Sequence, residues 1–197
     1  MKKANTIVFF ATPGGGKDTH SRLLIKYLEE VLKEPVLYIG TGDEFRKLDQ
    51  SNHTNNIVKK TIVGGGLAPD FLVESIVGNS MIQNMTQDCH LILNGFPRTL
   101  AQAEKLFEMA KFYNHKVKVV FLKISPEEAT KRIVGRKSGR LDGSVDSIRK
   151  RFEVFERENV SLENYFKSNF ELICIDGDDE KEKVHKKIVK SLKLNID

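Results

Sequence analysis

A glycine-rich stretch that ends in a lysine lies near the start of the chain, in FFATPGGGKDTH at residues 9–20. Backbone N–H groups of such a loop can face phosphate oxygens, and the lysine can reach the outer phosphates. The stretch departs from the phosphate-loop pattern G-x-x-x-x-G-K-S/T at two places. Ala11 replaces the first glycine, and Asp18 stands where the hydroxyl residue belongs, with Thr19 one position late. These residues predict a phosphate-binding loop with an added carboxylate; a strand-to-helix turn without a ligand is the alternative.

Five short apolar runs supply the elements that must position this loop. They lie at 6–10, 36–39, 91–93, 117–122 and 172–175. Most are continuous rather than alternating, which is typical of parallel strands buried on both faces. Helical patterns lie between them at 17–33, 69–87, 100–113, 126–134, 145–167 and 179–193. The alternation predicts an α/β fold, a doubly wound five-stranded parallel sheet with helices on both faces.

Two stretches interrupt the alternation. Residues 41–90 carry several helical pieces in place of one crossover, and residues 135–144 form a polar, glycine-rich loop. Both are expected to be flaps over a site, and simple surface elaboration is the alternative.

Composition narrows the classes of partner. The 197 residues are 40% hydrophobic and 30% charged, as in ordinary globular proteins. A formal net charge of +5 is too mild and too evenly spread to predict nucleic-acid binding, but it suits a small polyanion. No apolar run approaches the ~20 residues of a membrane span. Cys89 and Cys174 lie far apart without a CxxC, so we expect no zinc and a cytoplasmic location.

Two further motifs directly follow predicted strands. ThrGlyAspGluPheArg occupies 41–46 after the second strand, and LeuAsnGlyPheProArgThrLeuAlaGln occupies 93–102 after the third. In this order with the glycine loop, and with GlyLeuAlaPro at 66–69, they make the chain resemble the adenylate kinases, within the nucleoside monophosphate kinase family. The resemblance extends over nearly the whole chain, and the brevity of 135–144 is similar to the short-lid form, which carries no zinc cysteines.

The resemblance implies transfer of the terminal phosphoryl group of ATP to AMP, giving two ADP with Mg²⁺, by a monomer without a nucleic-acid or membrane partner. The two substrates bring roughly six negative charges together, which cations must neutralise. No general base is expected, because the acceptor phosphate is already ionised. The expected cations are Lys17, Arg46, Arg98, Arg132, Arg136, Arg140 and Arg151. Arg132 also fits a bracing role on the lid helix.

Specific sites follow from the resemblance, residue by residue. The implied catalytic residues are Lys17, Arg98, Arg136, Arg140 and Arg151. The implied ATP site comprises Gly14, Gly15, Gly16, Lys17, Asp18, Thr19, Arg136 and Gly177. The implied AMP site comprises Thr41, Arg46, Gly66, Leu67, Ala68, Gly95, Phe96, Pro97, Arg98, Gln102, Arg140 and Arg151. Thr19 and Asn94 are expected to serve Mg²⁺, largely through water.

The resemblance also implies a division of the single kinase domain 1–197. The expected core comprises 1–40, 71–134 and 145–197. The expected insertion that binds the monophosphate is 41–70, and the expected short lid is 135–144.

The chain departs from the family pattern at several positions. The pattern has Gly, Gln and Asp where this chain has Asp18, His20 and Asn94, and a second Asp where it has Gly143. Asn94 loses a charge, so we expect weaker Mg²⁺ binding that Asn94→Asp would restore. The Asp18 carboxylate suits a helix N-terminus but repels phosphate, so we expect Asp18→Gly to tighten ATP.

Two other functions stay open. One is a kinase of UMP or CMP, against which Thr41 and Gln102 argue because both suit adenine. The other is a nucleotide-binding protein that has lost catalysis, which Asp18, Asn94 and Gly143 favour. The retained lysine and arginines argue against that second alternative, because a mere binder needs fewer transition-state contacts.

Overall fold

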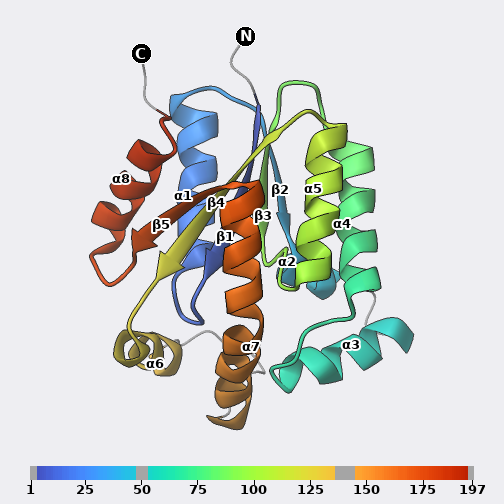
Figure 1. Cartoon of the computed structure of the whole chain (residues 1–197), viewed down its shortest axis with the longest axis vertical. Coiled ribbons are helices and arrows are strands. Elements are labelled where there is room, and N and C mark those ends of the chain that lie inside the picture. The colour runs from blue at the N-terminus through green and yellow to red at the C-terminus, as the bar shows by residue number, and fades with distance from the viewer. Residues whose placement is uncertain (1–3, 48–52, 136–144, 195–197) are drawn as a thin grey trace.

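The computed structural model describes residues 4–47, 53–135 and 145–194. Within them a parallel sheet has the strand order β2-β3-β1-β4-β5, with helices on both faces (Figure 1). The strands are β1 (Asn5–Ala11), β2 (Val36–Gly40), β3 (His90–Asn94), β4 (Lys116–Lys123) and β5 (Glu171–Asp176). The predicted fold class is confirmed, and each apolar run of the sequence forms one strand.

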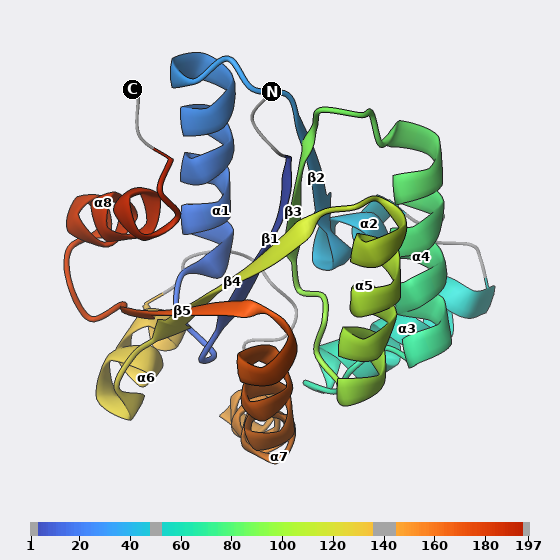
Figure 2. The same ribbon diagram turned by 45° about the horizontal axis from the view of Figure 1, so that its top comes forward.

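Side chains of the central strand β1 alternate between two cores. Ile7 and Phe9 pack on one face of the sheet with apolar side chains of α1 and α8. Val8 and Phe10 pack on the other face with those of α4, α5 and α7. Figure 2 shows this division, with α1 and α8 on one side of the sheet and the other three helices opposite. These helices are α1 (Lys17–Lys26), α4 (Asp70–Asn84), α5 (Leu100–Phe112), α7 (Val145–Asn169) and α8 (Lys181–Ser191).

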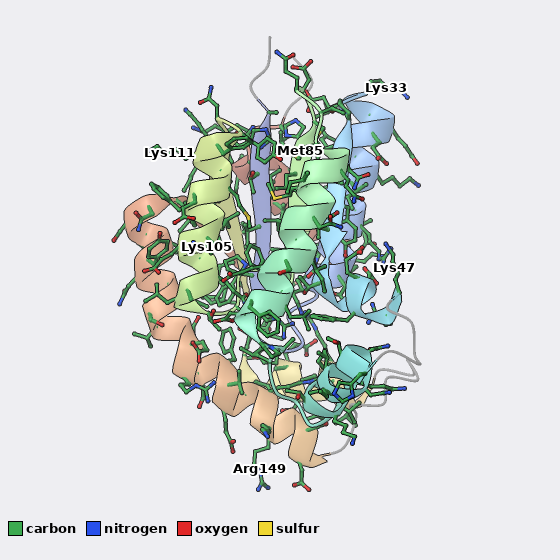
Figure 3. All side chains as sticks on the ribbon, turned by 90° about the vertical axis from the view of Figure 1, so that its right-hand side faces the viewer. Lys33, Lys47, Met85, Lys105, Lys111 and Arg149 are labelled. Atoms are coloured by element: carbon green, nitrogen blue, oxygen red, sulfur yellow. The ribbon has the colours of Figure 1, made fainter. Side chains whose placement is uncertain are left out.

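The stretch between β2 and β3 holds several helices, as predicted. α2 (Thr41–Lys47) begins directly where β2 ends, and α3 (His53–Val63) precedes α4. In Figure 3, which views α4 and α5 from outside, α3 lies beneath the lower end of α4. The strands of Figure 1 point toward this same end, so α3 lies near their carboxyl ends.

Two helix boundaries differ from the prediction. The helix expected over 17–33 is α-helical only to Lys26 and continues as a π-helical turn, η1 (Tyr27–Val31). The wider turn shifts side chains around the helix axis, and Val31, at its end, is 47% exposed. Pro69, expected in a first turn, instead immediately precedes α4. α6 (Pro126–Val134) begins as predicted, with the Ser125 side chain accepting a hydrogen bond from the Glu128 N–H.

None of the helices in the described ranges is long and apolar enough to cross a membrane.

Candidate active site

The strands β1, β2 and β3 end at one cavity of about 800 Å³. Its walls come from the glycine loop after β1, from α2 and α3, from the segment after β3, and from α7. Ligands of doubly wound folds bind at this edge of the sheet, outside the carboxyl ends of the strands. The volume lies within the ~300–1,000 Å³ range of small-molecule sites.

The glycine loop depends on glycine at two positions. Gly14 and Gly16 have φ values of 88° and 79°, in the left-handed region. α6 lies against the loop, because a Cβ built on Gly14 would be 3.0 Å from the Ala129 carbonyl oxygen. The Gly15 N–H donates to the Thr12 carbonyl at 2.8 Å, which closes the turn. Gly16 leads directly into α1, so the loop presents a helix N-terminus at the cavity.

The cavity gathers many of the residues singled out in the sequence. The predicted site residues on its wall are Gly14, Lys17, Asp18, Thr41, Arg46, Gly66, Leu67, Asn94, Gly95, Pro97, Arg98 and Arg151. Among the described residues, its cationic wall consists of Lys17, Arg22, Arg46, Lys59, Arg98 and Arg151. The carboxylates on the described part of the wall are Asp18, Asp43 and Glu158. The wall therefore carries an excess of positive charge, as an anionic ligand requires.

Other predicted residues lie elsewhere. Gly15, Gly16, Thr19, Ala68, Phe96, Gln102 and Gly177 are not on the cavity wall. Thr19, expected to serve a metal ion, is exposed on α1. Arg136, Arg140, Asp142 and Gly143 lie outside the described residues, as does nearly all of the predicted lid.

Gln102 is buried behind the cavity rather than on its wall. Its side chain is 1% exposed, and its Oε1 accepts from the Arg98 N–H at 2.8 Å. Its Nε2 donates to Asp70 Oδ1 at 2.7 Å, and the Thr99 hydroxyl donates to the same oxygen at 3.1 Å. Both ends of the amide thus hold the loop that carries Arg98.

Arg132 joins α6 to the segment after β5. Its Nε donates to Glu128 Oε1 at 2.7 Å, and its Nη2 donates to the Gly177 carbonyl at 2.9 Å. The hydrogen bond from Arg132 lowers the pKa of Glu128. Arg132 is absent from the cavity wall, so its position fits the bracing role.

A polar network links the loop to the ends of β2 and β3. Asn94 Nδ2 donates to Asp18 Oδ1 at 2.9 Å and to the Tyr38 hydroxyl at 3.1 Å. Tyr38 in turn donates to Asp43 Oδ2 at 3.2 Å. Burial raises the pKa of Tyr38, so this phenol keeps its proton at neutral pH. Asp43 also accepts from Arg46 and lies 3.5 Å from Arg22 Nη2.

Sequence reasoning missed several wall residues. Val58 and Ile62 lie four residues apart on α3 and line the cavity, so helical spacing could have revealed them. Asp43 lies inside the quoted motif at 41–46 but received no role. Phe155 and Glu158 of α7 carried no comparable signal.

A magnesium ion carried by a nucleotide fits this wall. No group of three or more acidic, histidine or cysteine side chains that could hold a metal ion occurs in the described parts of the chain. Mg²⁺ needs no such cage, since it binds through water, substrate phosphates and one or two protein oxygens. Two suitable oxygens are present: the Asp18 carboxylate, and Asn94 Oδ1, which is buried without a hydrogen-bond partner among the described residues.

Comparisons with known proteins agree with this geometry. The family model for "Adenylate kinase" matches residues 9–171. A protein of Rickettsia bellii named adenylate kinase is 28% identical over 220 aligned positions, covering 96% of this chain and 99% of that protein. One of Oenococcus oeni with the same name is 31% identical, covering 95% and 97%. One of Parabacteroides distasonis is also 31% identical, covering 87% and 88%.

Proposed function

The chain belongs to the adenylate kinase family and is thus a nucleotide phosphotransferase, and from this premise we propose that it reversibly transfers the terminal phosphoryl group of ATP to AMP, giving two ADP. One observation carries the proposal. Lys17 at the start of α1, Arg98 after β3 and Arg151 on α7 all line one cavity. Three elements far apart in sequence thus direct cations to the place where two phosphate chains would meet.

The donor side of this proposal is the glycine loop. The N–H groups at the start of α1 bind the outer phosphates of ATP, and Lys17 reaches them from the same turn. Gly177 and Arg136 complete the ATP site. Mg²⁺ supplies charge neutralisation between the phosphates when bound. The chain's own part is to orient the nucleotide and exclude water, since phosphoryl transfer is catalysed mainly by positioning and electrostatics.

The acceptor side comprises the residues after β2 and β3. Arg46 and Arg98 hold the AMP phosphate, and Arg140 and Arg151 bridge it to the donor. The proposed AMP site comprises Thr41, Gly66, Leu67, Gly95 and Pro97 on the cavity wall, together with the buried Ala68 and Phe96. The Thr41 hydroxyl donates to the Gly95 carbonyl at 3.1 Å, so it also holds this wall in place. No side chain needs to remove a proton, because the acceptor oxygen is ionised at neutral pH.

Motion belongs to the proposal as well. Residues 41–70 form the monophosphate-binding insertion and residues 135–144 the lid, which enclose the substrates and then release products. α3 supports this assignment, because Val58 and Ile62 cover the cavity from within the insertion.

The position of Gln102 bears on whether UMP or CMP is also an acceptor. The amide expected to lie near adenine is 1% exposed and off the cavity wall, and it uses one oxygen lone pair for Arg98 and one N–H for Asp70. One of the two arguments against UMP and CMP is thereby weakened. AMP remains the proposed acceptor because the relatives are named adenylate kinase.

The test measures ADP production directly. Purified protein is mixed with Mg²⁺, ATP and one of AMP, UMP, CMP or GMP, and products are followed by phosphorus NMR. The variant Lys17→Met, purified identically, controls for contaminating kinase from the expression host. Its rate of ADP formation is expected to be lower by ~10²–10³, the usual effect of losing one group that stabilises charge in the transition state. The proposal is supported if ADP forms fast from ATP with AMP as the acceptor and slowly with UMP, CMP or GMP. Equal rates from Lys17→Met, or no transfer to AMP, would refute it.

A further inference from the structure

Two departures from the family pattern, Asp18 and Asn94, contact each other. Asp18 lies in the first turn of α1 and Asn94 at the end of β3, 76 residues later. Asn94 pairs in register with Phe9 of β1 and Gly40 of β2, so it lies between the segments that follow both strands. Its Nδ2 donates to Asp18 Oδ1 at 2.9 Å.

The hydrogen bonds fix how the Asn94 amide is turned. The Asn94 side-chain nitrogen donates one hydrogen bond to Asp18 and one to the Tyr38 hydroxyl, which itself donates to Asp43. An amide oxygen in place of that nitrogen would face the Asp18 carboxylate and be repelled. Asn94 Oδ1 therefore points away from both acceptors, and at 6% exposure for the residue it has no partner among the described residues.

The contact also explains why position 94 carries an amide. An aspartate there would place a second carboxylate at hydrogen-bond distance from Asp18, and two such groups cannot both be ionised cheaply. With Asp18 and Asn94, the pair carries one negative charge. The family pattern of glycine at 18 and aspartate at 94 also carries one, but on the residue at the end of the strand, whereas here it is on the residue after Lys17.

The Asp18 carboxylate lies where a nucleotide's Mg²⁺ would be bound. In phosphate-binding loops the residue after the lysine turns its side-chain oxygen to Mg²⁺, and here that residue is Asp18. The Asp18 side chain is 38% exposed and lines the cavity beside Lys17, whose Nζ is 4.0 Å from Oδ1. Carboxylate oxygens are preferred by Mg²⁺, whereas Thr19, the expected alternative, is exposed off the wall.

We propose that Asp18, oriented by Asn94, is the acidic group that holds the Mg²⁺ of the bound nucleotide in this chain. The proposal rests on ATP being a substrate, as proposed above. It replaces the view of Asp18 as a merely repulsive charge: the carboxylate disfavours metal-free ATP and favours the magnesium complex.

The measured quantity is the ratio of ATP dissociation constants without and with Mg²⁺, obtained by calorimetry in EDTA and in excess Mg²⁺. Asp18→Asn is expected to lower this ratio by ~10–100-fold, the usual effect of losing a group that supports a bound metal. Metal-free ATP should bind this variant more tightly. Mn²⁺ titration of each ATP complex, followed by electron paramagnetic resonance, should show the same loss of metal affinity.

Two further variants make the test specific. Asn94→Asp alone should weaken metal-free ATP, while the exchange Asp18→Gly with Asn94→Asp should restore the wild-type ratio to within about twofold. Glu158→Gln, which removes another carboxylate from the same wall, should leave the ratio unchanged. The proposal is overturned if Asp18→Asn tightens ATP equally in both buffers, or lowers the ratio no more than Glu158→Gln. Either result can occur while AMP is still phosphorylated, so it is distinguishable from failure of the proposed function.

Discussion

His20, directly behind the phosphate loop, should make the stability of the protein depend on pH. The residue is 5% exposed on α1, and a Cβ built on Gly16 would be 3.4 Å from its ring. Burial, with smaller contributions from the cations of its surroundings, lowers the pKa of His20 from 6.5 to about 4. The charged groups around it are His185, Arg132 and Lys181, which lower the pKa, and Glu182, which raises it.

The sign follows from proton uptake. The unfolded chain protonates His20 near its ordinary pKa of 6.5, and the folded chain only near 4. Between these values the unfolded state holds more protons, so the free energy of unfolding falls as the pH falls. These two pKa values give a loss of about 2 kcal/mol between pH 7 and pH 5, where few carboxylates titrate. For a chain of this size that is roughly 4–8 °C in Tm.

The assay is urea unfolding at pH 7, 6 and 5 in EDTA, followed by circular dichroism. His20→Gln, which introduces the family residue, should remove most of the pH dependence. A smaller slope should persist, because burial also lowers the pKa of His185. His53→Gln, at an exposed position of α3, is the matched control and should behave as wild type. If His20→Gln loses as much stability between pH 7 and pH 5 as wild type, the reasoning is refuted.

Three other perturbations test the site and its supports. Arg151→Ala should lower kcat/KM by ~10²–10³, because it removes a cation from the cavity wall. Arg149 projects from the exposed tip of α7 (Figure 3), so Arg149→Ala should change kcat/KM little, and equal losses in the two variants would contradict this. Gly65→Ala should cost ~2–4 kcal/mol in urea unfolding, because φ is +81° and the new Cβ would lie 2.5 Å from a backbone oxygen of α7; a loss below ~1 kcal/mol would contradict the packing. Asp70→Ala should raise the KM for the monophosphate and leave that for ATP unchanged, because it removes the oxygen that accepts from Gln102 and Thr99. A change in both constants would point to general damage.

Much of the fold could be predicted because its signals are local. Buried parallel strands need continuous apolar runs, and each run at the predicted position became a strand. The Ser125 cap was predictable for the same reason, since its partner is three residues away. The π-helical turn at Tyr27–Val31 was not predictable, because its sequence YLEEV suits an α-helix equally well. Its geometry depends on tertiary contacts such as the Tyr27 hydroxyl bond to the Leu194 carbonyl at 2.9 Å.

The candidate site divides in the same way. Motifs revealed the residues that begin or end elements at the sheet edge, such as Lys17 and Arg98. They gave no information on side chains that act through distant partners. Gln102 was expected to lie near the adenine, yet it is 1% exposed and one of its N–H groups is bound to Asp70, 32 residues earlier. A motif specifies which residue is present, whereas the hydrogen-bond capacity left for a ligand depends on neighbours that the motif does not contain.

The pair of Asp18 and Asn94 shows the consequence most clearly. Taken singly, Asn94→Asp restores a lost charge and should ease magnesium binding, and Asp18→Gly removes a repulsive one. The 2.9 Å contact between the two side chains changes the first expectation, because the restored carboxylate would meet the Asp18 carboxylate and so weaken the binding of metal-free ATP. It also limits the second expectation to metal-free ATP, because removing Asp18 would leave the pair without a carboxylate for Mg²⁺. In the sequence, Asp18 and Asn94 look like two independent defects, whereas in the structure they are one exchange of a carboxylate between neighbouring positions. Only Asp18→Gly and Asn94→Asp made together should preserve the function of the pair.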